Sequence, residues 1–136
     1  MRIGMIMTDT DSYHDLACGL REHGHQVTIL AKTSVEQIGD YQDIAAFMQA
    51  AQGFDLIHSC IGAAPVIFSP FIPTPMLCTL DDYLRSEEVD ICRKAPARCY
   101  FAATHQRHVV EGIRHLFVLE NGMDVVAMYL SAYELI

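Results

Sequence analysis

Short apolar segments alternate with segments of helical periodicity along the whole chain, and this alternation constrains the fold more than any other feature. Arg2 to Met7 is a nearly continuous apolar run that ends at polar residues, which is typical of a strand buried on both faces of a parallel sheet. From about Tyr13 to His23 apolar residues recur at helical spacing, and Gly24 follows as a C-terminal stop. This pattern predicts an α/β fold in which crossover helices join parallel strands.

The same reasoning places the other elements. Further strands are expected at Gln26 to Leu30, Leu56 to Ser59, Met76 to Thr79, Arg98 to Ala103 and His115 to Leu119. Helical segments are expected at about Asp40 to Gln52, Ala63 to Phe68, His105 to Glu111 and Met123 to Ile136. The segment from Tyr83 to Cys92 is compatible with a helix or a loop, and Asn121-Gly122 is typical of a turn.

Together these segments predict a single Rossmann-like, doubly wound parallel sheet of about six strands with helices on both faces. Residues 1–122 are expected to form this domain, and residues 123–136 an amphipathic helix that packs on it. A chain of 136 residues makes about one domain, which leaves no room for a second nucleotide-binding domain.

Charge and hydropathy exclude two classes of partner. Lys and Arg number 9 against 17 Asp and Glu, which gives a formal net charge of -8 and argues against an extended nucleic-acid-binding surface. The longest apolar stretch, Ile61 to Leu80, is interrupted by four prolines, so no membrane span is expected. The first residues, MRIGMIM, do not form a signal peptide, and the five cysteines contain no CxxC pair. We therefore expect reduced thiols and a cytoplasmic location.

Polar residues follow several of the predicted strands. Ligands of open parallel sheets bind beyond the carboxyl ends of the strands, near the point where strand order reverses. This rule selects the loops Thr8 to Ser12, Ser59 to Gly62, Thr79 to Asp82 and Thr104 to Arg107. In and beside such segments, the candidate ligand-binding residues are Asp9, Thr10, Asp11, His58, Ser59, Asp81, Asp82 and Asn121. The carboxylates and hydroxyls suit a sugar, an amine or a hard divalent cation, and capping of helices and turns is their alternative role.

Several familiar chemistries lack their motifs. Neither GxGxxG nor GxxxxGK[ST] occurs, so no nucleotide cofactor is expected, and the seven histidines lack the spacing of metal ligands. Asp9-Thr10-Asp11 permits a Mg-dependent phosphotransferase of the haloacid dehalogenase type, with Ser59 on the phosphate and Asp81-Asp82 as metal ligands. That chemistry requires a lysine near the nucleophile, and none lies between Ser59 and Asp81.

His58 is the histidine of greatest interest. At the end of the third predicted strand it is expected to point toward the cleft or into the sheet interior. A nucleophilic pair with Cys60 is conceivable because alternate residues of a strand share one face, but no orienting carboxylate can be predicted.

Six phrases occur in a characteristic order. They are MRIGMI at the start, LREHGHQVTILA (Leu20 to Ala31), FDLIHS (Phe54 to Ser59), PTPMLCTLDD (Pro73 to Asp82), YFAATHQRHVVEG (Tyr100 to Gly112) and VLENGMD (Val118 to Asp124). Together they resemble the amino-terminal domain of family 4 glycosyltransferases with the GT-B fold. The final stretch, Met123 to Ile136, is similar to the helix that closes that family's carboxy terminus and packs back on the first domain.

The resemblance implies an acceptor-side domain. In that family the amino-terminal domain mainly holds the acceptor, and a second Rossmann-like domain, which is missing here, holds the nucleotide-sugar donor. Two positions depart from the family: Thr8 to Ser12 replaces a turn that is often rich in glycine, and Asp81 stands where a histidine is frequent.

Two functions follow as expectations. In the first, the chain contributes to glycosyl transfer: Asp9, Asp11, Ser59 and Asp81 surround a sugar or glycan acceptor, and a nucleotide-sugar-binding partner chain or a homodimer supplies the donor site. In the second, the chain is a non-catalytic domain, derived from a glycosyltransferase, that binds a sugar-like ligand or a protein partner.

Overall fold

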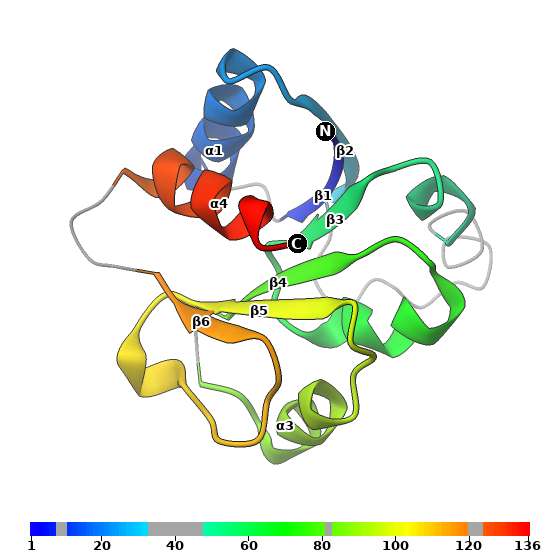
Figure 1. The fold of residues 1–136 in the computed structure, drawn as a ribbon, viewed down its shortest axis with the longest axis vertical. Helices are drawn as coiled ribbons and strands as arrows, with labels where there is room; N and C mark the ends of the chain where they lie inside the picture. The colour runs from blue at the N-terminus through cyan, green and yellow to red at the C-terminus, as the bar shows by residue number, and fades with distance from the viewer. Residues whose placement is uncertain (8–10, 33–47, 81–82, 120–123) are drawn as a thin grey trace.

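The computed structural model describes residues 1–7, 11–32, 48–80, 83–119 and 124–136. These residues form a sheet of six parallel strands in the order β2-β1-β3-β4-β5-β6 (Figure 1). The strands are β1 (Arg2–Met7), β2 (Gln26–Lys32), β3 (Leu56–Ser59), β4 (Met76–Leu80), β5 (Cys99–Ala103) and β6 (Leu116–Val118). The predicted α/β fold with one doubly wound parallel sheet is confirmed, and the bounds expected for β1 and β3 match those observed.

Helices cover both faces of this sheet. They are α1 (Asp11–Glu22), the 3-10 helix η2 (Ala64–Phe71), α3 (Ser86–Arg93), the short 3-10 helix η3 (Gln106–His108) and α4 (Val125–Glu134), and residues 48–51 are also helical. In Figure 1, α1 and α4 lie on one side of the sheet and α3 lies on the other. The expected helix from Asp40 to Gln52 is described only from residue 48, and the Asn121-Gly122 turn lies outside the described residues.

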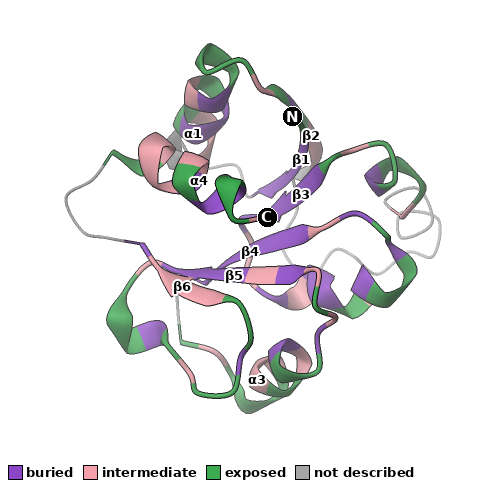
Figure 2. Cartoon of the chain, viewed as in Figure 1, coloured by how far each residue is buried: buried purple, intermediate pink, exposed green. Residues whose placement is uncertain are grey.

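Two apolar cores sandwich the sheet, which explains why the strands read as continuous apolar runs. On one face, Met5 and Met7 of β1 pack with Leu16 and Leu20 of α1 and with residues of α4. On the other face, Ile6 belongs to a core that includes η2 and α3. Figure 2 shows the buried central strands between exposed outer surfaces of the helices.

Local backbone chemistry explains where several elements end. Gly24 has a φ of +88° after α1, the left-handed conformation that glycine adopts without a steric cost, and it allows the chain to turn into β2. The predicted strand from His115 to Leu119 is shortened to β6, because His115 has a φ of 54° and therefore leaves the extended region.

The short helical turn expected near Ala63 to Phe68 is present as η2, and two other segments differ from or resolve the expectation. Pro65 lies in the first turn of η2, where a proline is tolerated, whereas Pro70 lies inside it, where the missing N–H and the ring disfavour a longer α-helix. The segment predicted as helical from His105 to Glu111 is helical only at η3, because Val109 has an extended backbone. In the ambiguous segment from Tyr83 to Cys92, α3 begins at Ser86 and continues to Arg93, and its capping box pairs Arg85 with Glu88.

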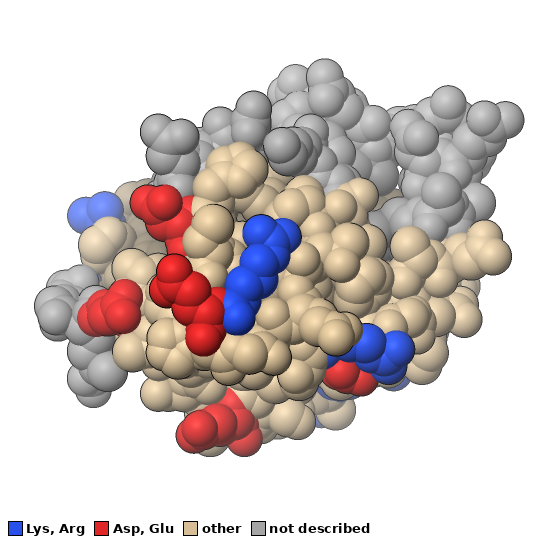
Figure 3. Space-filling model, turned by 90° about the horizontal axis from the view of Figure 1, so that it is seen from above, with Lys and Arg blue, Asp and Glu red and all other residues tan. Residues whose placement is uncertain are grey.

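No helix of the described residues is long and apolar enough to cross a membrane. Acidic and basic side chains are scattered among uncharged ones on the face shown in Figure 3, and the described residues visible there form no continuous basic surface.

Candidate functional site

The order of the strands creates a switch point beside β1. β1 lies between β2 and β3, so the chain continues to one side after β1 and to the other after β2. Ile6 of β1 is in register with Ser59 of β3, and the Cys60 amide donates a 2.7 Å hydrogen bond to the Ile6 carbonyl. The ends of these two strands therefore lie side by side at the edge where parallel sheets bind ligands.

The structure describes some of the predicted site residues and leaves others outside its described ranges. Asp9, Thr10, Asp81, Asp82 and Asn121 lie outside the described residues. Asp11 is the first residue of α1, and His58 and Ser59 are the last two residues of β3. Ser59 and the end of β1 thus lie side by side at one edge of the sheet.

His58 is fully buried in the sheet interior beneath α4. Its Nδ1 lies 2.7 Å from the Tyr133 hydroxyl, and its Nε2 lies 2.9 Å from the Thr79 hydroxyl. Burial lowers the pKa of His58 to about 3, since a charged imidazole would lose its solvation there. The ring is therefore neutral near pH 7, with one nitrogen donating and the other accepting.

The network continues to a second tyrosine of α4. The Thr79 hydroxyl lies 2.7 Å from the Tyr129 hydroxyl, and the Tyr129 ring centroid lies 4.7 Å from that of His58. Tyr129 and Tyr133 are four residues apart, which places them on one face of the helix, and this spacing is the signal for their shared role. The four side chains join α4 to the carboxyl ends of β3 and β4.

Ser59 shapes the loop after β3. Its side chain is buried, and the hydroxyl donates a 2.9 Å hydrogen bond to the Gly62 carbonyl. Gly62 has a φ of +88°, which favours glycine, and no atom lies within 4 Å of the position that a Cβ would occupy. The Ser59 hydroxyl therefore closes a turn at the switch point and does not face solvent. The phosphotransferase interpretation requires this hydroxyl to bind a phosphate, and its buried hydrogen bond to Gly62 disfavours that role.

A second polar cluster lies beyond β4 and β5. The His108 ring lies edge-on to the rings of Tyr83 and His105, with centroid distances of 5.3 Å to each. His108 is only 3% exposed, and the Arg107 Nε lies 3.4 Å from its Nε2. Sequence reasoning selected the loop from Thr104 to Arg107, but it did not single out His108, whose burial depends on packing against Tyr83.

The described residues show no geometry for thiol or metal chemistry. Both ring nitrogens of His58 bond hydroxyls, so a nucleophilic pair with Cys60 is not formed. Burial raises the pKa of Cys78 well above its usual value and that of Cys92 to about 12, which leaves both as inert thiols. Within the described ranges, no group of three His, Cys, Asp or Glu side chains is arranged to hold a metal ion.

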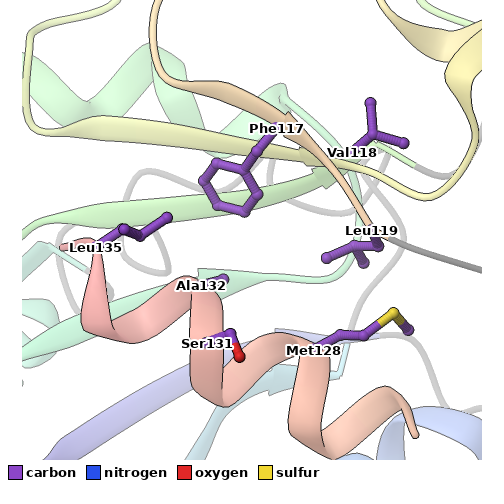
Figure 4. Close-up of a pocket in the computed structure, with 7 residues that line it drawn as sticks. All are labelled: Phe117, Val118, Leu119, Met128, Ser131, Ala132 and Leu135. Atoms are coloured by element: carbon purple, nitrogen blue, oxygen red, sulfur yellow. The ribbon is translucent and has the colours of Figure 1, made fainter. Parts of the chain in front are cut away.

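An apolar pocket of about 330 Å³ lies between the β6 segment and α4 (Figure 4). Phe117 and Leu119 point toward α4, whereas Val118 points away. The lining residues are Phe117, Val118, Leu119, Met128, Ser131, Ala132 and Leu135. Among the described residues, neither His58 nor Ser59 contributes to this lining.

No family model, curated protein or solved structure matches the chain significantly. The architecture is therefore Rossmann-like in the general sense of a six-stranded, all-parallel α/β sheet, and no family is assigned to the chain.

Proposed function

We propose that the chain is an acceptor-side domain that contributes to glycosyl transfer together with a nucleotide-sugar-binding partner chain or a second subunit. The observation that carries this proposal is the switch point, where the ends of β1 and β3 meet through the Cys60 to Ile6 hydrogen bond. Ser59 is the last residue of β3, Asp11 is the first residue of α1, and Asp9 lies between β1 and α1 in the sequence.

These residue types suit a sugar hydroxyl. A carboxylate accepts hydrogen bonds from hydroxyl groups, so Asp9 and Asp11 would orient the acceptor and hold the proton of its nucleophilic oxygen. Ser59 would act by positioning, because its hydroxyl already closes the turn at Gly62. Asp81 follows β4, which neighbours β3, and would bound the acceptor on that side.

A partner is proposed because one Rossmann-like domain with no glycine-rich phosphate motif offers no recognisable donor site. A partner's nucleotide-sugar domain that faces this edge of the sheet would complete the site.

Ligand-dependent thermal unfolding tests the proposal, because a ligand that binds only the native state raises the melting temperature. We expect a shift with free sugars or glycans and none with UDP-, GDP- or ADP-sugars. The double variant Asp9→Asn/Asp11→Asn should lose the shift, whereas Asp90→Asn, an exposed change on α3, should retain it. If no sugar or glycan produces a shift, or if the double variant responds as the wild type does, the acceptor site is disproved; a nucleotide-sugar shift would instead place the donor site in this chain.

A non-catalytic binding domain is the second candidate, and the pocket between β6 and α4 favours it. Its lining side chains are mostly apolar, and one of them, Leu135, is 69% exposed. Such surfaces are typical of binding sites for apolar ligands or protein partners. This candidate would be supported if the chain binds a sugar but no glycosyl group is transferred to that sugar when a donor-binding partner is present.

A further inference from the structure

A buried histidine with an unpartnered ring nitrogen lies beyond the carboxyl ends of β4 and β5. The His108 side chain is 3% exposed, and its Nδ1 has no hydrogen-bond partner in the part of the chain that the structure describes. Nearly all buried polar atoms are bonded in folded proteins, because an unpaired one loses its solvation without compensation. The Nδ1 atom therefore marks a position where a ligand atom would be stabilising.

The neighbouring arginine determines what that nitrogen can do. Arg107 Nε lies 3.4 Å from His108 Nε2, and a guanidinium nitrogen can only donate. His108 Nε2 therefore accepts, and the single proton of the neutral ring lies on Nδ1. The buried Nδ1–H is thus a donor with no acceptor among the described residues, and an oxygen atom of a ligand would satisfy it.

The groups around His108 supply a positive charge and exposed side chains through which a ligand could reach Nδ1. Arg107 is exposed, and its terminal nitrogens make no hydrogen bond or ion pair with other described residues. The rings of Tyr83 and His105 lie against His108, and both side chains are exposed, Tyr83 by 66%. Exposed side chains change rotamer within nanoseconds, so movement of either ring would open a path to Nδ1.

We propose that Tyr83, His105, Arg107 and His108 form a binding site for a ligand that carries a carboxylate or a phosphate. One oxygen of the oxyanion accepts the His108 Nδ1–H, and the Arg107 guanidinium binds the same group by a charge-assisted hydrogen bond. In a chain with a formal net charge of -8, the exposed Arg107 guanidinium and the His108 Nδ1–H together provide a cation and a hydrogen-bond donor for such a group. The site is independent of the acceptor role proposed above, since none of its residues belongs to the switch point.

Histidine ring signals measure the proposal directly. Protein labelled with 15N in its histidines is titrated with inorganic phosphate, with D-glucuronate and with D-glucose, with NaCl added to equalise ionic strength. We expect the His108 ring nitrogens to shift saturably with phosphate or glucuronate and not with glucose or NaCl. A response to only one of the two anions identifies the group that the site prefers.

Three variants of the site and one control variant separate binding from folding. Arg107→Gln alters an exposed side chain and should weaken binding by about 10- to 100-fold, the loss expected for a hydrogen bond to a charged group. His108→Leu should abolish binding, whereas His108→Asn places an amide N–H near the former Nδ1 and should retain part of it. His23→Gln, an exposed change in a histidine that bonds the Gly19 carbonyl, is the matched control and should bind as the wild type does.

Three results would overturn the proposal. The first is a His108 signal that responds to neither anion, and the second is binding that Arg107→Gln leaves unchanged. The third concerns Asp81 and Asp82, which precede Tyr83 in the chain. If the double variant Asp81→Asn/Asp82→Asn shifts the His108 signals and no added anion does, the acceptor is a carboxylate of this chain and no ligand site exists.

Discussion

The Tyr133 hydroxyl of α4 lies 2.7 Å from His58 Nδ1 of β3, and both groups are buried. The two residues are 75 positions apart in the chain. This hydrogen bond, together with the bond between Tyr129 and Thr79, attaches the last helix to the centre of the sheet.

Removing the Tyr133 hydroxyl should destabilise the protein more than its small size suggests. Tyr133→Phe leaves His58 Nδ1 buried without a partner, and such a loss costs about 1–3 kcal/mol of unfolding free energy. Urea denaturation of the wild type and the variant measures this difference. Tyr100→Phe is the control, because Tyr100 is only partly buried and is not part of the network; an equal loss in both variants would contradict the role of the hydrogen bond.

Protonation of His58 should make the fold sensitive to acid. The pKa of His58 falls from 6.5 to about 3 on folding, so between these values the unfolded chain binds the proton and the folded chain does not. Stability therefore rises with pH across this window and is lost as pH falls from about 6.5 toward 3, by up to about 1.4 kcal/mol per pH unit.

Two measurements check the acid sensitivity. The unfolding free energy of His58→Gln should depend less steeply on pH than that of the wild type between about pH 6 and pH 4. The ring nitrogens of His58 should also report a neutral imidazole at about pH 5, where an unperturbed histidine is charged. A ring that titrates near 6.5 would refute this prediction even if His58→Gln does not fold.

Gly19 of α1 permits close contact with α4. A Cβ at this position would lie 2.4 Å from Val126 Cγ2, so Gly19→Ala should destabilise the protein through overpacking. Overpacking costs about 1–3 kcal/mol, and the higher helix propensity of alanine offsets part of this cost. In the Val126→Ala background the clash is relieved, and the same change should stabilise by about 0.5–1 kcal/mol. A double-mutant cycle by urea denaturation measures this reversal, and additive effects would show that the helices do not meet as described.

One cysteine should react much faster than the other four. Cys18 is exposed on α1, whereas Cys60, Cys78, Cys92 and Cys99 are buried. Burial also raises the pKa of Cys78, Cys92 and Cys99, which suppresses the reactive thiolate. A colorimetric thiol reagent should therefore modify one thiol rapidly in the native protein and five after denaturation, and Cys18→Ser should eliminate the rapid phase. Rapid modification of a second thiol in Cys18→Ser would contradict the buried positions.

Much of the fold could be predicted because its signals are local. Apolar runs indicate the bounds of β1 and β3 because both faces of these strands are covered. The helical spacing of apolar residues and the following Gly24 indicate α1. The carboxyl-edge location of the candidate loops follows from parallel strands alone. β6 was predicted too long at both ends, and at its start His115 has a φ of 54°, a conformation that residues other than glycine rarely adopt and that the apolar pattern does not indicate.

The candidate site shows what only tertiary structure decides. The sequence by itself determined that His58 ends a buried strand and that Tyr129 and Tyr133 share a helix face. It did not determine that these side chains meet, because that contact requires α4, which follows β6 in the chain, to return across the sheet to β3 and β4. Likewise, His108 is readable as a loop histidine, but its burial and its unpartnered Nδ1 depend on packing against Tyr83. The spacing of apolar residues indicates which side of its own helix or strand each residue occupies. Contacts between residues distant in sequence depend instead on how the helices and strands pack.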